Sequence, residues 1–351
     1  MRSSFMLTLT GLGAATLAWA AEPAKPSGFP DTGLTTRYTK TFGEDADFTG
    51  RAPAYKDNQD GTITDLVTGL IWQKTDGGEM TWERAQAYAQ SLRLAEKSDW
   101  RLPNSMELLS LMNHGMHGPA MDTTFFTKTD ARYWWTNSPR ADDASKVWLV
   151  NTGGGIGAHA KTETVSAGGE RPVHVRCVRG TSSLGPGPSL KDNGDGTVTD
   201  QRTGLCWQKV GGSAKLSWED ALRYCTELNL GGQKDWRLPN IKELRSLSDD
   251  RRTQPSLDRA FFPSAAAAFY WSSTTQSNRP ERAWYVDFSS GLVTYADKTS
   301  AQLVLAVRGG VEQTGPRDKP TPDPKTLVGT GKERPPGEGK GKPKGAKKKG
   351  E

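Results

Sequence analysis

The turn at residues 193–196 combines residue types that could bind a calcium ion. Its Asn-Gly-Asp-Gly order is similar to the middle of a calcium loop. Such a loop needs a carboxylate two positions before the Asn and another at its twelfth position, and these positions hold Lys191 and Arg202. The pattern therefore favours a tight Asp-Gly turn between two strands over a calcium site.

His114 and His117 are the second candidate for a metal site, because two histidines at this spacing can hold zinc. They lie in a glycine-containing loop with no cysteine nearby, and a zinc site needs three or four converging ligands. We therefore predict no metal site and no cofactor.

No motif indicates catalytic residues. The sequence lacks the G-x-S-x-G nucleophile elbow and the H-E-x-x-H metalloprotease pattern. All four histidines lie before residue 180, so a hydrolytic mechanism that uses His cannot be shared by both halves of the chain. The chain is predicted not to be an enzyme.

The elements that would position these residues occur twice in the chain. Three segments repeat with few changes. The first is KDNQDGTITDLVTGLIWQK at 56–74 and KDNGDGTVTDQRTGLCWQK at 191–209. The second is DWRLPN, identical at 99–104 and 235–240, and the third is a closing VRG at 178–180 and 307–309. A repeat of this length indicates tandem globular domains rather than a solenoid. We place copy 1 at residues 56–180 and copy 2 at residues 191–310, joined by a Gly/Pro/Ser-rich linker at residues 181–190.

Each copy is predicted to fold as two helices followed by short antiparallel strands. In copy 2, Ser217 and Asn240 are the predicted N-caps, since each has an acidic residue three positions later. The first helix places Trp218, Ala221 and other apolar side chains on one face. Later segments alternate apolar and polar residues, as in 284–288, which is typical of half-buried strands. Two helices followed by strands indicate an α+β domain.

Residues 1–20 are predicted to be a secretory signal peptide. Arg2 precedes an apolar stretch, and the small residues that a signal peptidase recognises follow at Ala18 and Ala20. The mature chain would begin with a leader segment, residues 21–55, and it holds no apolar run long enough to span a membrane. We expect an exported protein, periplasmic or extracellular.

Charge is concentrated at the carboxyl end. The chain has 46 Lys and Arg against 40 Asp and Glu, but residues 21–310 carry 34 of each sign, so the excess comes from the tail at residues 311–351. This Lys/Gly/Pro-rich tail is predicted to be disordered. It is a candidate binder of anionic polysaccharide or another envelope component, with nucleic acid as the less favoured partner and a solubilising tail without a partner as the alternative. The candidate lysines are Lys344, Lys347, Lys348 and Lys349.

Motifs in both copies resemble those of one family. They are DGTVTDxxTGLxW, the W-x-x-A-x-x-Y helix, DWRLPN with a Glu three residues later, YWSSTT, AWYVDFSSG and the closing VRG. Together they are similar to the Lcl C-terminal-domain family, formerly a domain of unknown function. The resemblance covers both copies and implies an exported protein, and the function that it suggests by analogy is adhesion through sulfated glycans.

The W-R-L-P segment before a helix is also similar to the C-type-lectin-like and formylglycine-generating-enzyme fold. The resemblance therefore implies two tandem C-type-lectin-like α+β domains. The sequence lacks three features of related proteins: the redox cysteine pair of the enzymes, the Glu-Pro-Asn or Gln-Pro-Asp motif of the calcium lectins, and a collagen-like Gly at every third position. Enzyme and calcium-lectin functions are thereby disfavoured.

In domains of this fold a helix cysteine commonly pairs with a cysteine of the closing strand, and each copy here keeps one half of that pair. Cys177 lies in the closing strand of copy 1, and Cys225 on the first helix of copy 2. The resemblance thus implies a candidate Cys177–Cys225 disulfide between the copies, which an oxidising compartment would allow. Unpaired buried thiols and a Cys206–Cys225 bond are the alternatives.

Trp135 is the candidate binding residue within the folded domains. When Trp134-Trp135 is set against Trp271-Ser272, copy 1 has an additional aromatic residue beside a shared one. An exposed Trp135 would offer a stacking surface to the apolar face of a sugar ring. Core packing is the alternative.

These observations predict an exported, non-enzymatic binding protein, an adhesin-like binder of anionic glycans at the cell envelope or outside the cell. The alternative is a structural or protein-interaction module without a small ligand.

Overall fold

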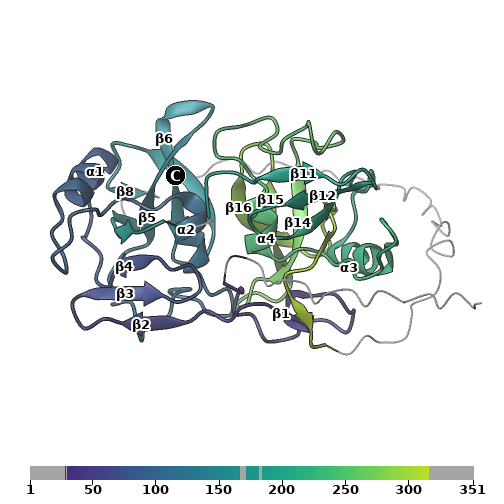
Figure 1. Ribbon diagram of the computed structural model, residues 1–351, viewed down its shortest axis with the longest axis horizontal. Coiled ribbons are helices and arrows are strands. Elements are labelled where there is room, and N and C mark those ends of the chain that lie inside the picture. Colours follow the sequence, from purple (N-terminus) through teal and green to yellow (C-terminus); the bar gives the residue numbers. More distant parts are fainter. Residues whose placement is uncertain (1–27, 29, 167–170, 182–183, 316–351) are drawn as a thin grey trace, which may run out of the picture. The chain divides into compact units, whose positions relative to one another are not determined.

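The computed structural model describes residue 28 and residues 30–166, 171–181 and 184–315. The predicted signal peptide and the four candidate tail lysines lie outside these ranges. Within them, four α-helices are combined with strands that pair almost entirely antiparallel, so the α+β class is confirmed (Figure 1). No helix in the described ranges is both long and apolar enough to cross a membrane.

Each copy opens with a small antiparallel sheet that also contains its closing strand. The strand order is β10-β4-β3-β2 in copy 1 and β11-β12-β13-β17 in copy 2. The bounds are β2 Tyr55–Asp57, β3 Thr62–Asp65, β4 Ile71–Gln73, β10 Val178–Arg179, β11 Leu190–Asp192, β12 Thr197–Asp200, β13 Cys206–Gln208 and β17 Val307–Arg308. The closing VRG strand pairs with β4 in copy 1 and with β13 in copy 2, so the beginning and the end of each copy lie side by side.

The Asp-Gly turn of copy 2 is the tight turn that the sequence predicted. Asp195 accepts hydrogen bonds from the backbone N–H of Thr197 at 3.0 Å and from its hydroxyl at 2.5 Å. Asn193 donates to the same hydroxyl across the turn at 2.8 Å. Gly196 follows with a φ of 87°, a left-handed conformation that glycine adopts without strain. These polar side chains therefore stabilise the turn itself.

Two helices per copy follow the small sheet. They are α1 Trp82–Ser91 and α2 Ser105–Ser110 in copy 1, and α3 Trp218–Glu227 and α4 Ile241–Ser246 in copy 2. Ser217 accepts a hydrogen bond from the backbone N–H of Asp220, and Asn240 forms a capping box with Glu243. The predicted N-caps of copy 2 are confirmed.

The DWRLPN and VRG motifs are joined to each other by ion pairs. In copy 2, Arg237 binds both carboxylate oxygens of Glu243 at 2.6 Å and donates to the carbonyl oxygen of Gly309 at 2.8 Å. Arg308 of VRG pairs with Asp235 of DWRLPN at 2.7 Å. The same contacts recur in copy 1 as Arg101–Glu107 and Arg179–Asp99. The repeated motifs therefore hold each copy closed.

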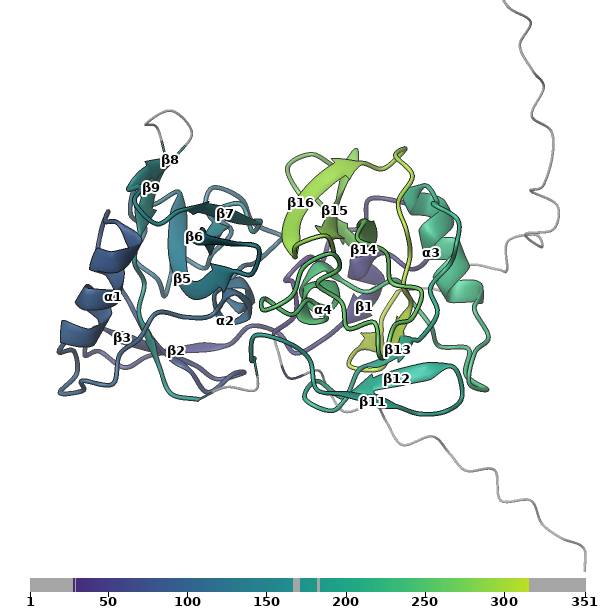
Figure 2. The ribbon, with the colours of Figure 1, turned by 90° about the horizontal axis from the view of Figure 1, so that it is seen from above.

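The two copies share one eight-stranded sheet, in the order β14-β15-β16-β7-β6-β5-β9-β8 (Figure 2). The bounds are β5 Tyr133–Arg140, β6 Asp143–Asn151, β7 Ile156–Ala160, β8 Val165–Ser166, β9 Arg171–His174, β14 Phe269–Thr275, β15 Arg282–Asp287 and β16 Leu292–Asp297. Neighbouring strands are antiparallel except β5 and β9, which are parallel. The copies meet where Ile156 of β7 pairs with Val293 of β16.

Ile156 and Val293 hold equivalent places in their copies. Trp148 of β6 pairs with Ala158, and its counterpart Trp284 of β15 pairs with Tyr295. Ile156 and Val293 each lie two residues before those partners. Antiparallel pairing of equivalent residues is what a two-fold relation produces, so the copies associate as the subunits of a symmetric dimer do.

One hydrophobic core extends through both copies. It contains Leu109 of α2 and Leu244 of α4, two helices that contact each other, together with Trp72 and Trp207 from the two small sheets. Two further clusters belong to copy 1 and to copy 2 alone. Because the largest cluster is shared, neither copy completes its core without the other.

The leader segment and the start of the tail fold onto copy 2. The elements are the 3-10 helix η1 Asp45–Asp47 and the strands β1 Phe48–Thr49 and β18 Glu312–Gln313. Asp45 accepts a hydrogen bond from the Thr274 hydroxyl of β14 at 2.6 Å, and β1 pairs with β18. The prediction that the disordered tail starts at residue 311 is therefore wrong, because residues 312 and 313 form a strand with the leader.

Candidate functional site: a cleft between the two copies

Trp135, the predicted binding residue, lies in the protein interior. Its side chain is fully buried, and its indole N–H donates to the carbonyl oxygen of Met80 at 2.8 Å. Strand register makes Trp135 the counterpart of Trp271 and Trp134 the counterpart of Tyr270, so copy 1 has no additional aromatic residue here. The interpretation as an exposed stacking surface is wrong, and the core alternative holds.

The predicted Cys177–Cys225 disulfide is not formed. All three cysteines fall within the described ranges and are free thiols, so the rival Cys206–Cys225 bond is absent as well. Cys177 belongs to the core cluster of copy 1 and Cys225 to that of copy 2, which explains why the bridge hypothesis is wrong. Burial raises the pKa of Cys177 to about 12, so its reactive thiolate form is scarce near neutral pH.

His114 and His117 do not meet other metal-ligating side chains. Among the described residues, no group of three or more His, Cys, Asp or Glu side chains comes together as metal ligands would. Both histidines instead line a cleft at the junction of the copies.

This junction cleft has a volume of about 610 Å³. It lies where the loops after α2 and β6 of copy 1 face β15, β16 and the loop after β14 of copy 2. Its principal side chains are His114, His117, Arg132, Tyr133 and Asn151 from copy 1, and Gln276, Asn278, Trp284 and Tyr295 from copy 2. Both copies are therefore needed to build it.

Two aromatic rings of copy 2 form the apolar part of the junction cleft. Trp284 and Tyr295 are paired across β15 and β16, and their ring centroids lie 5.5 Å apart at an interplanar angle of 86°. Trp284 is only 4% exposed, whereas Tyr295 is 39% exposed. The tryptophan is therefore buried, whereas the tyrosine ring is partly exposed, with the Arg282 guanidinium over it at 5.4 Å from the ring centroid.

His114 is held against Trp284 in a neutral state. Its ring lies 5.3 Å from the Trp284 ring, edge to face, and its Nε2–H donates to the carbonyl oxygen of Gly154 at 3.2 Å. Burial, aided by the charge of Lys242, lowers the pKa of His114 to about 3. With the proton on Nε2, the Nδ1 atom of His114 is a hydrogen-bond acceptor.

Several buried polar atoms around the junction cleft have no hydrogen-bond partner among the described residues. They are His114 Nδ1, Gln276 Oε1 and Trp284 Nε1. Buried polar atoms are nearly always paired, but these three are shielded from solvent and do not themselves face the open space of the cleft.

Charge in the junction cleft is one-sided. Arg132 is exposed and forms no ion pair with any described residue. None of the described residues that line the cleft is an Asp or a Glu. An anionic group would therefore meet a free guanidinium and no opposing carboxylate.

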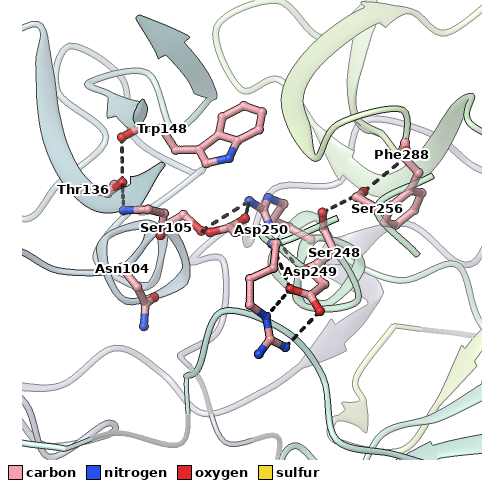
Figure 3. A network of polar contacts seen from close by, with 12 residues as sticks. Asn104, Ser105, Thr136, Trp148, Ser248, Asp249, Asp250, Ser256 and Phe288 are labelled. Atoms are coloured by element: carbon pink, nitrogen blue, oxygen red, sulfur yellow. Dashed lines mark hydrogen bonds and ion pairs between the residues drawn. The ribbon is translucent and has the colours of Figure 1, made fainter. Parts of the chain in front are cut away.

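A hydrogen bond from copy 1 to a buried ion pair of copy 2 joins the two copies. Ser105 of α2 donates to Asp250 at 2.5 Å, and Asp250 pairs with Arg245 of α4. Arg245 also donates to the Ser105 hydroxyl at 3.3 Å. Figure 3 shows Ser105 pointing from copy 1 directly at Asp250 of copy 2. All three side chains are buried, so this contact fixes the position of α2 against α4.

The repeated segments match the Lcl C-terminal domain family at residues 61–179 and 196–308, once in each copy. The chain belongs to this family. The family assignment made from the motifs is thus confirmed, with two tandem Lcl C-terminal domains. No curated protein matches the chain.

Sequence patterns did not single out the aromatic and charged residues of the junction cleft. The cleft arises from the pairing of two Lcl C-terminal domains through β7 and β16, which the pattern of one domain does not contain. One signal was available in the comparison of the copies, since Tyr295 stands where copy 1 has Ala158.

Proposed function

We propose that this chain is an exported, non-enzymatic protein that binds an anionic glycan in the junction cleft. The observation that carries the proposal is the combination of an exposed tyrosine ring, amide side chains, an unpaired arginine and the lack of carboxylates among the described lining residues. Family resemblance to adhesins that recognise sulfated glycans agrees with this chemistry.

Each part of the junction cleft suits one feature of an acidic sugar. The apolar C–H face of a sugar ring packs on an aromatic ring such as Tyr295. The exposed Asn278 offers both a donor and an acceptor to sugar hydroxyls, and Asn151, whose oxygen already accepts from Gly153 and Gly155, offers its amide N–H groups. Arg132 would form a charge-assisted hydrogen bond to a sulfate or carboxylate. The volume of about 610 Å³ falls within the range of roughly 300–1,000 Å³ found for ligand sites.

The C-type-lectin-like fold of each copy is part of the same proposal. It is supported by the two helices of each copy and by the closing strand that returns to the opening sheet. Export and location at or beyond the cell envelope rest on the sequence of residues 1–20.

Heparin affinity chromatography tests the proposal with matched variants. Arg132→Ala should elute at lower salt than the parent chain, because it removes the free cation of the cleft. Arg259→Ala is the control, since Arg259 is also exposed but does not line the cleft. Tyr295→Ala should weaken binding of a heparin oligosaccharide by about tenfold, equal to about 1.4 kcal/mol. Phe269→Ala, which truncates another exposed aromatic ring, should not.

A form that ends at residue 315 separates the junction cleft from the basic tail. Retention of this form on heparin, and its loss in the Arg132→Ala variant, would support the cleft. Retention that depends only on residues 316–351 would assign binding to the tail and refute the cleft proposal. If neither form is retained, the chain is better described as a structural or protein-interaction module.

A further inference from the structure

Copy 2 contains a second cavity, of about 300 Å³, that shares no lining residue with the junction cleft. Its interior is apolar, and the most buried side chains are Leu257, Phe262, Tyr270 and Leu305, each at most 4% exposed. Ser213, Ser264 and Val210 also line it and are exposed. Lys209 lines it too and is paired with Asp192. The cavity, here the copy-2 pocket, thus has an apolar interior and a partly polar rim whose one cation is already neutralised.

The equivalent place in copy 1 is filled by ionisable side chains. Asp76 accepts hydrogen bonds from His174 Nδ1 at 2.8 Å, from the Thr129 hydroxyl at 2.7 Å and from Trp134 Nε1 at 3.1 Å. Arg176 lies 3.6 Å from the same carboxylate, with its guanidinium 5.7 Å from the Trp134 ring. In copy 1 this space is therefore used by a buried polar network.

Strand pairing establishes that the two places correspond. His174 pairs in parallel with Trp134. Leu303 bridges Tyr270 in the same parallel sense. The correspondence from copy 1 to copy 2 is Asp76 to Gly211, Thr129 to Ala265, His174 to Leu303 and Arg176 to Leu305. Every member of the polar network is replaced by glycine or an aliphatic residue, and Trp134 by the smaller Tyr270.

These replacements remove charge and side-chain volume together. Gly211 supplies no side chain in the place of Asp76, although a Cβ there would lie only 2.8 Å from the Val304 carbonyl oxygen and 3.3 Å from Leu305. The leucines offer no hydrogen-bonding group. Water or a charged ligand inside would find few polar partners, whereas an apolar group would bury its surface there at no such cost. An apolar cavity of roughly 150 Å³ holds benzene, so the copy-2 pocket has room for a molecule of about two rings.

We infer that the copy-2 pocket is a binding site for a small, uncharged amphiphile whose aromatic or hydrocarbon part of about two rings enters the apolar interior. The single polar end of this ligand lies at the rim, where the Ser213 and Ser264 hydroxyls can bond to it. This site does not depend on the proposed glycan function, because it uses different residues of copy 2.

Isothermal titration calorimetry of the full chain with 2-naphthol tests this inference. The expected result is saturable binding of one molecule per chain that changes little between 50 and 500 mM salt, because no ion pair is involved. Binding that weakens steeply with salt, or no saturable binding at all, would overturn it. Arg132→Ala should bind 2-naphthol as the parent chain does, so the outcome is separate from that of the heparin experiment.

Filling variants locate the site. Ala265→Leu adds a larger side chain inside the pocket and should weaken 2-naphthol binding at least tenfold. Ala214→Leu is the matched control, because Ala214 is exposed and does not line the pocket. Tyr270→Trp, which introduces the larger ring found in copy 1, should also weaken 2-naphthol binding. It replaces Ala265→Leu as the test if that variant does not fold. Unchanged affinity in a folded filling variant would refute the assignment.

Discussion

Asp250→Ala should destabilise the whole described unit, because it breaks the buried ion pair at the junction of the copies. Asp250 accepts hydrogen bonds from Ser105 of copy 1 and from Arg245 of copy 2. The alanine variant leaves the Arg245 guanidinium, which is fully buried, without its carboxylate. It also leaves the Ser105 hydroxyl without its acceptor.

The expected loss follows from the burial of this pair. Removing one partner of a buried ion pair costs about 3–5 kcal/mol, because the other charge stays desolvated and unpaired. The Arg282–Asp297 pair is a suitable comparison, since its carboxylate is 60% exposed. Exposed pairs contribute about 0–1 kcal/mol, so Asp297→Ala should change the free energy of unfolding by no more than that.

Urea unfolding followed by tryptophan fluorescence measures both variants. The shared core predicts one cooperative transition for the two copies, shifted to lower urea in Asp250→Ala. The Arg245→Leu/Asp250→Ala double variant should recover much of the loss, because Leu109 occupies the equivalent helix position in copy 1 and an apolar replacement of a buried pair is often neutral. A loss below about 1 kcal/mol in Asp250→Ala, or a double variant as unstable as the single one, would refute this reasoning.

Two further predictions concern buried ionisable groups. Alkylation of the denatured, unreduced chain should add three labels, while the buried Cys177 and Cys225 stay unlabelled in the native protein; a single label after denaturation would restore the disulfide hypothesis. Although burial raises the pKa of Asp76, the hydrogen bond from His174 and the charge of Arg176 outweigh it and lower this pKa from 3.8 to about 2. The stability that ionised Asp76 contributes is therefore present above pH 4 and lost as the pH falls through 2. Asp76→Asn should lower stability at pH 7 and flatten the acid limb of the stability profile, and an unchanged limb would contradict the assignment.

Local features of this chain could be predicted because their causes lie close together in the sequence. Asn240 and Glu243 form the capping box that their three-residue spacing indicates. The Asp195-Gly196 turn is closed by hydrogen bonds within five residues. In both features the interacting groups are neighbours along the chain, so the sequence contains the whole interaction.

The candidate site could not be predicted because its causes are distant in sequence. Trp135 and Trp271 look different in a sequence comparison that slips by one residue, although the offset of 136 residues between the two DWRLPN motifs, like the strand register, makes them equivalent. The cysteine pairing failed for a related reason: besides the shared core, each copy has a smaller cluster of its own, and Cys177 and Cys225 lie in different ones. The junction cleft depends on contacts between the copies, namely the pairing of β7 with β16, the shared core and the hydrogen bond from Ser105 to Asp250, and the pattern of one copy alone does not specify them.

The two-fold relation between the copies predicts a second cleft on the opposite side of the axis. The sequence differences between the copies explain why the cationic group on that side is already paired with a carboxylate. Gln276, Asn278 and Tyr295 of the junction cleft correspond to Arg140, Asp142 and Ala158. Arg140 pairs with Asp142 at 2.6 Å, and its guanidinium lies 5.7 Å from the Trp148 ring.

On that side, therefore, Arg140 is neutralised by Asp142 of the same copy and lies over Trp148. On the junction-cleft side, the corresponding tryptophan meets Tyr295, whose ring lies beside the Arg282–Asp297 pair, and uncharged amides. Arg132 there has no acidic partner among the described residues. A duplicated domain with unchanged copies would offer two like sites. The divergence of these few positions leaves one open site for an anion, so the folded part of the chain should bind one glycan segment and not two.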